Sequence, residues 1–537
     1  MDRQQTTARL TAETMEHGPT VTPSTFDAVV IGAGIGGLSA ALRLAGAGAR
    51  VAVLERADTI GGKMRVVHSA GRPIDAGPTV LTMRWVFEAL WADAGLDFHT
   101  AVPTERLDVL ARHGWTDGSR LDLHASVDAS AQAIAQFAGR KEADAFIRFH
   151  RHAQSIYDTV RLPFIEAPTP GIMAGLSNTG PRGLWQLMKI DWHRSLWKSL
   201  RSFFRDPRLV QLFARYATYS GSSPFLAPGT LALIAAVEQA GVWRVRGGMA
   251  NLARATADAV VQLGGEIHTG AEVVSIDIDA SGVTGVRCAD GTTLRCTTVV
   301  FNGGLAALSE GLLGERVAGA SPRKRPPPSL SAMTFCGIAR PRGFDLHWHN
   351  VFFSDDYEAE FDDIFSKARL PTSPTTYVCA QDRGAPRDAQ AGERVFCLVN
   401  APARGDEYDF QRDTQTCNTR MSQLLERCGL DLELSDVVTT TPTQFASMFP
   451  GTRGALYGPA THGATGAFAR PGVQTKIPGL FVVGGDVHPG AGVPMVTLGG
   501  RIAADRVCDR LGLTRRSPPA ATRGGTSTRS ATTASSR

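Results

Sequence analysis

The sequence predicts an α/β protein whose main sheet is parallel and is assembled from three separated stretches of the chain. Near the start, the apolar run Ala28–Ile31 leads into a glycine-rich turn, a helix of small residues to about Gly48, and a second apolar run at Val51–Leu54. Near the end, another apolar run, Leu480–Val483, leads into a second glycine-rich loop. Strands that alternate with helices in this way are typical of parallel sheets with helices on both faces.

The first glycine-rich turn has the spacing of a dinucleotide-binding loop. Its glycines form the motif Gly32-x-Gly34-x-x-Gly37. The first permits a tight turn, the second lets a pyrophosphate approach the backbone, and the third lets helix and strand pack closely. The N-terminus of the helix offers free N–H groups to phosphate, and Glu55, at the end of the second strand, is placed to accept hydrogen bonds from ribose hydroxyls. This order of elements predicts a Rossmann-like dinucleotide site.

The second glycine-rich loop predicts a cofactor that is bound at two ends. Gly484-Gly485-Asp486 directly follows the apolar run, and further glycines with Pro489 and Pro494 hold the backbone close to a flat group. Asp486 is placed to accept a hydrogen bond from a sugar-chain hydroxyl or to lie beside a pyrophosphate. A nicotinamide cofactor needs only the first loop, whereas FAD spans from a ribose at one loop to a ribityl chain and ring at the other. The two loops together therefore predict FAD.

Length and composition predict a globular protein of at least two domains. The chain has 537 residues, of which 43% are hydrophobic and 20% are charged, so a large core is expected. The formal net charge is +5, but residues 514–537 contain five arginines and no acid, so five minus five leaves the rest of the chain neutral. The charge therefore gives no reason to expect a nucleic-acid partner.

The cysteines and the apolar runs exclude further classes of protein. The eight cysteines lie between Cys288 and Cys508 without CxxC or metal-ligand spacing, so we expect reduced thiols and no metal site. No apolar run has the length of a membrane span, and the N-terminus lacks the apolar core of a signal peptide. We therefore expect a cytoplasmic protein that is peripherally associated with a membrane.

The nucleotide-binding features fall in three pieces, which predicts that other segments are inserted between them. The middle piece carries a helix predicted at Met249–Leu263 and a hairpin turn predicted at Asp290-Gly291, and the last piece carries a helix from Leu498. The predicted boundaries are 26–105, 236–310 and 471–513 for the FAD-binding domain, 106–235 and 311–470 for an inserted α+β domain for substrate and membrane association, and 1–25 and 514–537 for flexible tails.

With these motifs in place, the chain resembles the carotenoid desaturases of the bacterial phytoene desaturase type, within the amine oxidase-like flavoproteins. The matching segments are GAGIGG (32–37), LERADTIGGKMR (54–65), DAGPTVLT (75–82), WRVRGGMANLARA (243–255) and VVGGDVHPGAGVPM (482–495). Two of them, extended as DAGPTVLTMRWVFEALW and GVWRVRGGMANLARA, are most similar to the hydroxyneurosporene or methoxyneurosporene desaturases. The resemblance implies an enzyme that introduces a double bond at C3–C4 of hydroxylated or methoxylated acyclic carotenoids.

The resemblance also implies which residues lie along the FAD. Gly61, Gly62 and Lys63 would lie along the flavin nucleotide, and Gly77 with Pro78 would border the isoalloxazine ring. The predicted cofactor residues are Gly32, Gly34, Gly36, Gly37, Glu55, Arg56, Gly61, Gly62, Lys63, Gly77, Pro78, Val274, Gly485, Asp486, Gly492 and Val493. Amine oxidases often tether the flavin through a cysteine shortly before the final Gly-Asp element. Residues 450–480 contain no cysteine, which favours non-covalent FAD.

The implied reaction removes two hydrogens from adjacent carbons beside a polyene. One leaves to the flavin as a hydride or its stepwise equivalent, and the other leaves as a proton. A cation that is spread over a long polyene is intrinsically stable, so no strong catalytic base is required. Oxygen or a quinone would then accept the electrons from the flavin.

The candidate proton-handling residues are His488, Asp144 and Arg148. On the helix predicted at Asp144–Tyr157, Asp144, Arg148 and His152 recur every four residues and share one face. That face is either a site that handles a proton or a substrate hydroxyl, or a solvated row of salt bridges. His488 lies in the second glycine-rich loop, where it either handles a proton or only hydrogen-bonds the loop backbone.

The segment 183–205 is predicted to form an amphipathic helix. The apolar stripe consists of Trp185, Met188, Trp192, Leu196, Leu200 and Phe203, and the opposite face carries Arg194, Lys198, Arg201 and Arg205. Such a helix suits the headgroup boundary of a membrane, or it packs its stripe into the inserted domain. Lys189 falls inside the apolar stripe and fits neither alternative.

Three alternatives to this interpretation remain open. The first is a phytoene or neurosporene desaturase of the same family, or another flavin oxidase of this fold, such as an amine or protoporphyrinogen oxidase. The second is a protein similar to the Rab GDP-dissociation inhibitors, which bind prenylated proteins without flavin. The third is a plain NAD dehydrogenase. The glycine motif together with Glu55 and Asp486 favours a flavin enzyme over the last two.

Overall fold

The structure is a computed structural model, and it describes residues 25–169, 190–322, 326–384, 392–464, 466 and 469–514. A five-stranded parallel sheet with the order β10-β3-β2-β14-β20 lies at the centre of the nucleotide-binding part. Its strands are β2 (Ala28–Ile31), β3 (Val51–Leu54), β10 (Glu266–His268), β14 (Val299–Phe301) and β20 (Leu480–Val482). They come from all three predicted segments of the FAD-binding domain. β2, β3, β14 and β20 are buried along their whole length, as the strands of a parallel sheet that is covered on both faces are.

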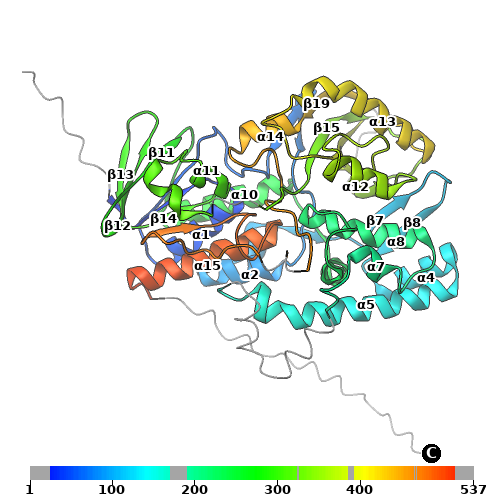
Figure 1. The fold of residues 1–537 in the computed structure, drawn as a ribbon, viewed down its shortest axis with the longest axis horizontal. Coiled ribbons are helices and arrows are strands. Elements are labelled where there is room, and N and C mark those ends of the chain that lie inside the picture. The colour runs from blue at the N-terminus through cyan, green and yellow to red at the C-terminus, as the bar shows by residue number, and fades with distance from the viewer. Residues whose placement is uncertain are drawn as a thin grey trace, which may run out of the picture.

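Three helices pack together beside this sheet, next to the first glycine-rich turn. α1 (Ile35–Gly46) packs against both α10 (Met249–Gln262) and α15 (Val493–Leu511), and Figure 1 shows α1 beside the red helix α15. The predicted start of the last helix at Leu498 is wrong, because α15 begins five residues earlier, at Val493. Pro494 lies in its first turn, where a residue without an N–H group costs no intrahelical hydrogen bond. The smaller elements around these helices are α2 (Trp85–Asp93), α3 (Phe98–Ala101), α11 (Leu305–Ser309), η4 (Glu315–Ala320), β4 (Val66–Ser69), β5 (Arg72–Asp75), β6 (Thr104–Arg106) and β9 (Trp243–Val245).

A four-stranded sheet is attached at the outer edge of the nucleotide-binding part (Figure 1). Its order is β1-β13-β12-β11, with β1 (Thr25–Phe26), β11 (Val273–Asp279), β12 (Gly282–Cys288) and β13 (Thr293–Cys296). The predicted turn at Asp290-Gly291 joins β12 to β13 as antiparallel neighbours, so this prediction is confirmed. Thr25 pairs with Arg295 in β13 and therefore does not belong to the predicted N-terminal tail. The rest of that tail and residues 515–537 lie outside the described residues.

The second large sheet has seven strands in the order β19-β15-β18-β17-β16-β7-β8. The strands are β7 (Val109–Gly114), β8 (Arg120–His124), β15 (Ser331–Ala339), β16 (His349–Phe352), β17 (Thr376–Ala380), β18 (Glu393–Ala401) and β19 (Leu434–Thr440). They belong to both predicted pieces of the inserted domain, 106–235 and 311–470. Helices α12 (Tyr357–Phe365), α13 (Thr414–Arg427) and α14 (Pro442–Met448) lie around this sheet (Figure 1). The domain boundaries drawn from the sequence stay a prediction.

A layer of helices completes the inserted part. Its members are α4 (Val127–Ala138), α5 (Arg140–Val160), the π-helical turn η1 (Arg161–Ile165), α7 (Leu196–Leu200), α8 (Pro207–Ala214), η2 (Arg215–Ser220), η3 (Gly229–Ala232) and α9 (Leu233–Ala240). α5 contains the predicted helix Asp144–Tyr157 and extends it at both ends. None of the helices in the described ranges combines the length and the apolar composition needed to cross a bilayer.

The segment 183–205 does not form the continuous amphipathic helix that its pattern predicts. Residues 190–195 form turns, and the helix is limited to the five residues of α7, whose N-terminus is capped by the side chain of Ser195. The remaining part of the prediction, which includes Trp185, Met188 and Lys189, lies outside the described residues.

A buried acid explains why the chain turns before α7. Asp191 has a φ of +54°, a left-handed conformation that interrupts a helix. Its carboxylate accepts hydrogen bonds from Ser199 Oγ at 2.7 Å and from Arg194 at 2.9 Å. Leu196 and Leu200 are fully buried in the core of the inserted part, which favours the alternative in which the apolar stripe packs inside the protein.

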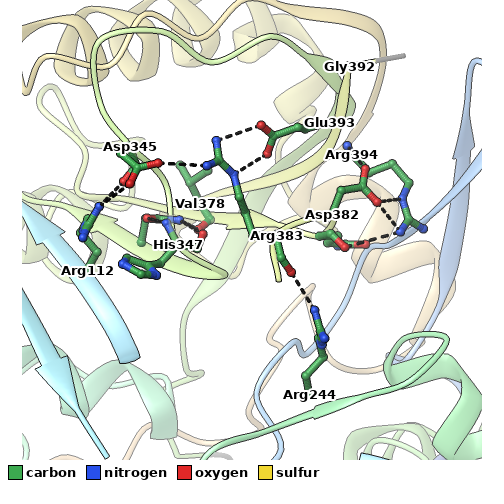
Figure 2. Close-up of polar contacts among 12 residues, drawn as sticks. Arg112, Arg244, Asp345, His347, Val378, Asp382, Arg383, Gly392, Glu393 and Arg394 are labelled. Carbon is green, nitrogen blue, oxygen red and sulfur yellow. Dashed lines mark hydrogen bonds and ion pairs between the residues drawn. The ribbon is translucent and has the colours of Figure 1, made fainter. Parts of the chain in front are cut away.

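An ion-pair network ties the seven-stranded sheet to the nucleotide-binding part, and Figure 2 shows its contacts around Asp382 and Arg383. Arg383, which follows β17, pairs with Glu393 at 2.7 Å and with Asp345 at 3.0 Å. The backbone carbonyl of Arg383 accepts a hydrogen bond from Arg244 on β9 at 2.7 Å. The neighbouring acid, Asp382, binds Arg394 of β18 and Arg72 of β5. These contacts hold the two parts in one orientation, and the cavity described below lies between them.

Candidate active site

One cavity of about 960 Å³ joins the nucleotide-binding part to the inserted part. This volume lies within the range of small-molecule and cofactor sites. Within the described residues, every predicted cofactor residue except Gly37 lines it: Gly32, Gly34, Gly36, Glu55, Arg56, Gly61, Gly62, Lys63, Gly77, Pro78, Val274, Gly485, Asp486, Gly492 and Val493. The cavity therefore brings together the two glycine-rich loops that lie more than four hundred residues apart in the chain.

Gly37 lies off the cavity and acts through packing. A Cβ atom at this position would lie 2.2 Å from the carbonyl oxygen of Gly32 and 3.1 Å from the side chain of Val30. Only glycine lets the first turn of α1 approach β2 so closely. The close packing agrees with the role predicted for the third glycine of the motif, whereas a contact of Gly37 with the cofactor stays a prediction.

The N-terminus of α1 is open toward the cavity. Its N-cap is Gly34, which has no side chain to occupy the first N–H groups of the helix, and Ile35 and Gly36 of the first turn line the cavity. Gly34 also forms a parallel bridge with Gly61, and Gly61 N donates to Ala33 O at 2.9 Å. The turn around Gly34 and the turn around Gly61 thus form one glycine-lined wall. The N–H groups of α1 lie at the end of this wall, and this arrangement suits a pyrophosphate.

Glu55 lies at the end of β3 and is 8% exposed. Its Oε2 accepts a hydrogen bond from Ala33 N at 2.7 Å, and its Oε1 accepts one from Ala57 N at 3.0 Å. These bonds fix the carboxylate at the cavity wall, and each oxygen retains a further lone pair for a ribose hydroxyl. The next residue, Arg56, donates to Ser447 O at 2.8 Å.

Lys63 and Asp486 form the opposite, charged wall. Lys63 Nζ donates to Leu456 O at 2.7 Å and lies 5.4 Å from the ring centroid of Phe449. Burial lowers the pKa of Lys63, and the nearby Asp486 opposes that shift. Asp486 Oδ2 accepts a hydrogen bond from Leu305 N at 2.8 Å. The carboxylate is thereby held beside the loop where the sequence places a sugar chain or a pyrophosphate.

The segment that carries Gly77 and Pro78 is pinned from two sides. A Cβ atom at Gly77 would lie 1.9 Å from the carbonyl oxygen of Lys63. Asp75, two residues earlier, accepts hydrogen bonds from Met249 N at 2.7 Å and Ala250 N at 3.3 Å, which caps α10. Burial raises the pKa of Asp75, and the two backbone N–H groups oppose that rise. The segment is thus fixed at the boundary between the two ends of the cavity.

Two residues that the sequence interpretation missed support the cofactor end. Asn302 Nδ2 donates to the carbonyl oxygens of Gly32 at 3.1 Å and Gly34 at 3.3 Å. Its position directly after the apolar strand β14 is a signal that could have identified it. Arg470 is 7% exposed and donates to Gly485 O at 3.1 Å. It lies in an irregular loop, where no local pattern marks it.

The other end of the cavity is mainly apolar. Its lining comes from α5, η1, α9 and the seven-stranded sheet: Val160, Phe164, Ile165, Leu233, Ile234, Val237, Val351, Phe396 and Leu398. A few polar side chains interrupt this wall, among them Arg215, Tyr219, Glu238 and Tyr377. An elongated apolar molecule with one polar group matches such a chamber.

The three candidate proton-handling residues lie in different surroundings. His488 lines the cavity, is 9% exposed, and its Nε2 lies 2.9 Å from Ala167 O. Burial lowers the pKa of His488, which keeps the ring neutral near pH 7. Asp144 and Arg148 are exposed on the outer face of α5, and in the described part of the chain neither lines the cavity. The structure therefore gives no support to a catalytic role for Asp144 and Arg148, and that role stays a prediction.

The residues of the first end fit an FAD molecule. The glycine-lined wall and the helix N-terminus accommodate a pyrophosphate, Glu55 is positioned for a ribose, and Asp486 with the second loop is positioned for the ribityl chain. Gly77 and Pro78, which are predicted to border the flavin ring, line the same cavity.

Comparisons with known proteins agree with this geometry. A family model for flavin containing amine oxidoreductases matches residues 35–508. A hydroxyneurosporene desaturase of Rubrivivax gelatinosus is 47% identical over 522 residues, which cover 95% of this chain and 98% of that protein. A hydroxyneurosporene desaturase of Cereibacter sphaeroides is 42% identical and covers 89% of this chain and 97% of its own length.

A solved oxidoreductase structure from Methanosarcina mazei has the same fold. It superposes with a TM-score of 0.58 at 17% sequence identity and covers 88% of this chain and 98% of its own. The likeness at this identity concerns the fold, whereas the family match concerns almost the whole sequence. The chain therefore belongs to the flavin-containing amine oxidoreductase family, and it is an FAD-dependent oxidoreductase.

Proposed function

We propose that this oxidoreductase desaturates an acyclic carotenoid that carries a hydroxyl or methoxyl group at C1, and that it removes the hydrogens from C3 and C4. The observation that carries the proposal is one cavity that joins a glycine-lined cofactor wall to a long apolar chamber. The 47% identity to a hydroxyneurosporene desaturase over nearly the whole chain supports the same substrate class.

The chamber performs the reaction chiefly by orientation and by exclusion of water. Its apolar wall removes the polyene from water, which favours binding through the hydrophobic effect. When bound, FAD supplies the electron acceptor for the hydrogen that leaves with its electron pair. The chain holds the Gly77–Pro78 segment rigidly between Asp75 and Lys63, so the reacting carbons meet the ring position in a fixed orientation.

His488 is the proposed acceptor of the proton. Its Nε2 faces the carbonyl oxygen of Ala167, and a carbonyl only accepts hydrogen bonds, so Nε2 carries the hydrogen and Nδ1 keeps a lone pair. The low pKa of this buried ring makes it a weak base. A weak base is sufficient where the developing charge is spread over a conjugated chain.

Peripheral membrane association is part of the proposal, because an apolar carotenoid is supplied from a bilayer. Leu162 in η1 is 69% exposed, Leu226 is 51% exposed and Trp192 is 38% exposed. Phe164 and Ile165, which follow Leu162 in η1, line the cavity. Exposed cations accompany these residues at Lys198, Arg201 and Arg205. Apolar tips with neighbouring cations suit an anionic membrane surface.

The proposal is tested with the purified, FAD-loaded protein in phospholipid vesicles. The vesicles contain a 1-hydroxylated acyclic carotenoid, its unsubstituted counterpart, or phytoene, and products are separated by chromatography and identified by their absorption spectra. Extension of conjugation by one double bond in the hydroxylated substrate is expected. Conversion of phytoene would instead favour the phytoene desaturase alternative, and oxidation of a simple amine would favour an amine oxidase. Turnover without oxygen, with and without an added quinone, identifies the electron acceptor.

A further inference from the structure

An ion pair and a tyrosine interrupt the apolar wall of the chamber. Arg215 and Tyr219 of η2 and Glu238 of α9 line the cavity. The other residues of α9 that line it are apolar: Leu233, Ile234 and Val237. Glu55, Glu272 and Asp486, the other carboxylates of the lining, belong to the cofactor end. A charged group therefore lies in a part of the chamber that is otherwise lined by apolar side chains.

Glu238 holds this group together. Its Oε2 accepts a hydrogen bond from Tyr216 at 2.6 Å, and its Oε1 accepts one from the hydroxyl of Tyr219. Arg215 Nη2 lies 3.7 Å from Oε1, and the side chains of Arg215 and Glu238 are only 12% and 5% exposed. Arg215 also hydrogen-bonds the side chain of Tyr219. Its Nε has no partner among the described residues, but protein encloses that atom, so a bound molecule meets Arg215 through the other atoms of the side chain, which lines the cavity.

Stability does not explain why these charges are buried. Transfer of an arginine and a glutamate out of water is unfavourable, and their attraction offsets this only when the pair is close and fully hydrogen-bonded. Here the nitrogen–oxygen distance is 3.7 Å and one guanidinium N–H is unpaired. Incompletely paired charges in a cleft are typical of binding sites.

The group shares its cavity with the segment that is predicted to border the flavin ring. Thr79 directly follows Gly77 and Pro78, and its Oγ1 lies 2.6 Å from the hydroxyl oxygen of Tyr377. Burial raises the pKa of Tyr377, and the neighbouring Cys379 and Tyr219 raise it further. Tyr377 thus joins the seven-stranded sheet to the segment that carries Gly77 and Pro78, and it lines the same cavity as Tyr219 and Glu238.

We propose that Arg215 and Tyr219 bind the terminal oxygen of the substrate, with Glu238 as the residue that positions both. Arg215 donates to the oxygen of a hydroxyl or methoxyl group. Tyr219 gives its own hydrogen to Glu238, so its oxygen accepts the hydrogen of a substrate hydroxyl. The assignment rests on the proposed function.

Binding of the terminal oxygen by Arg215 and Tyr219 also determines which carbon–carbon bond of the substrate reacts. Only C1 and C2 separate that oxygen from C3. A group that binds the oxygen close to the ring position therefore also places C3 and C4 at the ring. A hydroxyl forms two hydrogen bonds in this arrangement, a methoxyl forms one, and an unsubstituted end forms none. The expected order of kcat/KM is hydroxyl, then methoxyl, then unsubstituted.

Tyr219→Phe tests the assignment, and Tyr216→Phe is its matched control. Both hydroxyls donate to Glu238, but of the two only Tyr219 lines the cavity. The FAD-loaded wild type and variants are assayed with the three substrate ends in identical phosphatidylcholine vesicles, and flavin absorbance confirms equal loading. Tyr219→Phe is expected to lower kcat/KM for the hydroxylated substrate about tenfold and to leave the methoxylated one within about twofold. Tyr216→Phe is expected to keep all ratios.

The outcomes separate this assignment from the proposed function. If the wild type converts none of the three substrates, the proposed function is wrong. If the wild type converts all three equally well, or if both tyrosine variants change all three by the same factor, the substrate is desaturated but this group does not bind its oxygen. Arg215→Lys keeps the charge beside Glu238 but shortens its reach, and it should reduce the preference for both oxygenated ends. This second variant decides the assignment if Tyr219→Phe does not fold.

Discussion

Replacement of Glu55 by alanine tests where the adenosine end of FAD lies. The carboxylate accepts hydrogen bonds from Ala33 N at 2.7 Å and Ala57 N at 3.0 Å, and it lines the cavity at the end of β3. Glu55→Ala removes both the support of the first glycine-rich turn and the acceptor for the ribose hydroxyls. We expect weaker FAD binding by a chain that still folds.

The magnitude follows from the bonds that are lost. A hydrogen bond that involves a charged group contributes about 1.5–3 kcal/mol, and 1.4 kcal/mol corresponds to about a factor of ten in affinity. The dissociation constant for FAD should therefore rise about 10- to 150-fold. Part of this loss is the cost of the unpaired Ala33 N–H, so Glu55→Gln, which keeps one acceptor oxygen, should show a smaller change.

The assay is titration of the flavin-free protein with FAD, followed by flavin fluorescence and by the absorbance retained after gel filtration. Asp27→Ala is the matched control. Asp27 also accepts a backbone hydrogen bond, from Arg50 N at 2.7 Å, but among the described residues it does not line the cavity. This control should bind FAD like the wild type. Unchanged FAD affinity in Glu55→Ala would refute the assignment of the ribose site.

Four further changes probe other parts of the structure. Gly37→Ala places a Cβ atom 2.2 Å from Gly32 O, so thermal unfolding should show a loss of about 1–3 kcal/mol together with reduced flavin retention; an unchanged midpoint would contradict the packing role. Asp382→Asn weakens the pairs with Arg72 and Arg394, and urea unfolding should show a loss of about 1–3 kcal/mol. Burial raises the pKa of Glu360 from 4.5 to about 7. The folded protein therefore keeps this proton after the unfolded chain has lost it, so stability should fall as pH rises from 4.5 to 7. Glu360→Gln should flatten that slope, and equal slopes in both proteins would refute it. Leu162→Ser should lower sedimentation with anionic vesicles about tenfold, whereas no change would place the membrane contact elsewhere.

The elements that the sequence predicted correctly are those that depend on interactions within a few residues of the chain. β2 and β3 coincide with their predicted ranges, because a short, continuous apolar run between turns is compatible with little other than a buried strand. The turn at Asp290-Gly291 also has a local cause, because Gly291 has a positive φ, which favours glycine. The first glycine-rich turn follows from glycine spacing, which expresses a backbone requirement within a few residues, whereas Gly61, Gly62, Lys63, Gly77 and Pro78 were predicted from the family resemblance.

The predictions that the structure does not support depend on contacts between distant segments. The segment around α7 has helical periodicity, but Asp191 turns the chain there, and its carboxylate lies 3.0 Å from Nε2 of His152 on α5, 39 residues earlier in the chain. Asp144 and Arg148 share a helix face, and only the packing of α5 shows that this face is solvated. A periodic pattern identifies a face of a helix but contains no information about what lies opposite it.

The sequence by itself determined the parallel nucleotide-binding sheet, the glycine loops and the cofactor, because each depends on backbone geometry within a short stretch of chain. The tertiary structure alone decided the chamber and the group of Arg215, Tyr219 and Glu238 within it. Arg215 and Tyr219 belong to η2 and Glu238 belongs to α9, and the packing of these segments with the other walls places all three residues on one cavity. The physical reason is that a cavity forms only where surfaces pack together. The free-energy cost of burying a charge on its wall depends on the neighbouring residues that this packing supplies.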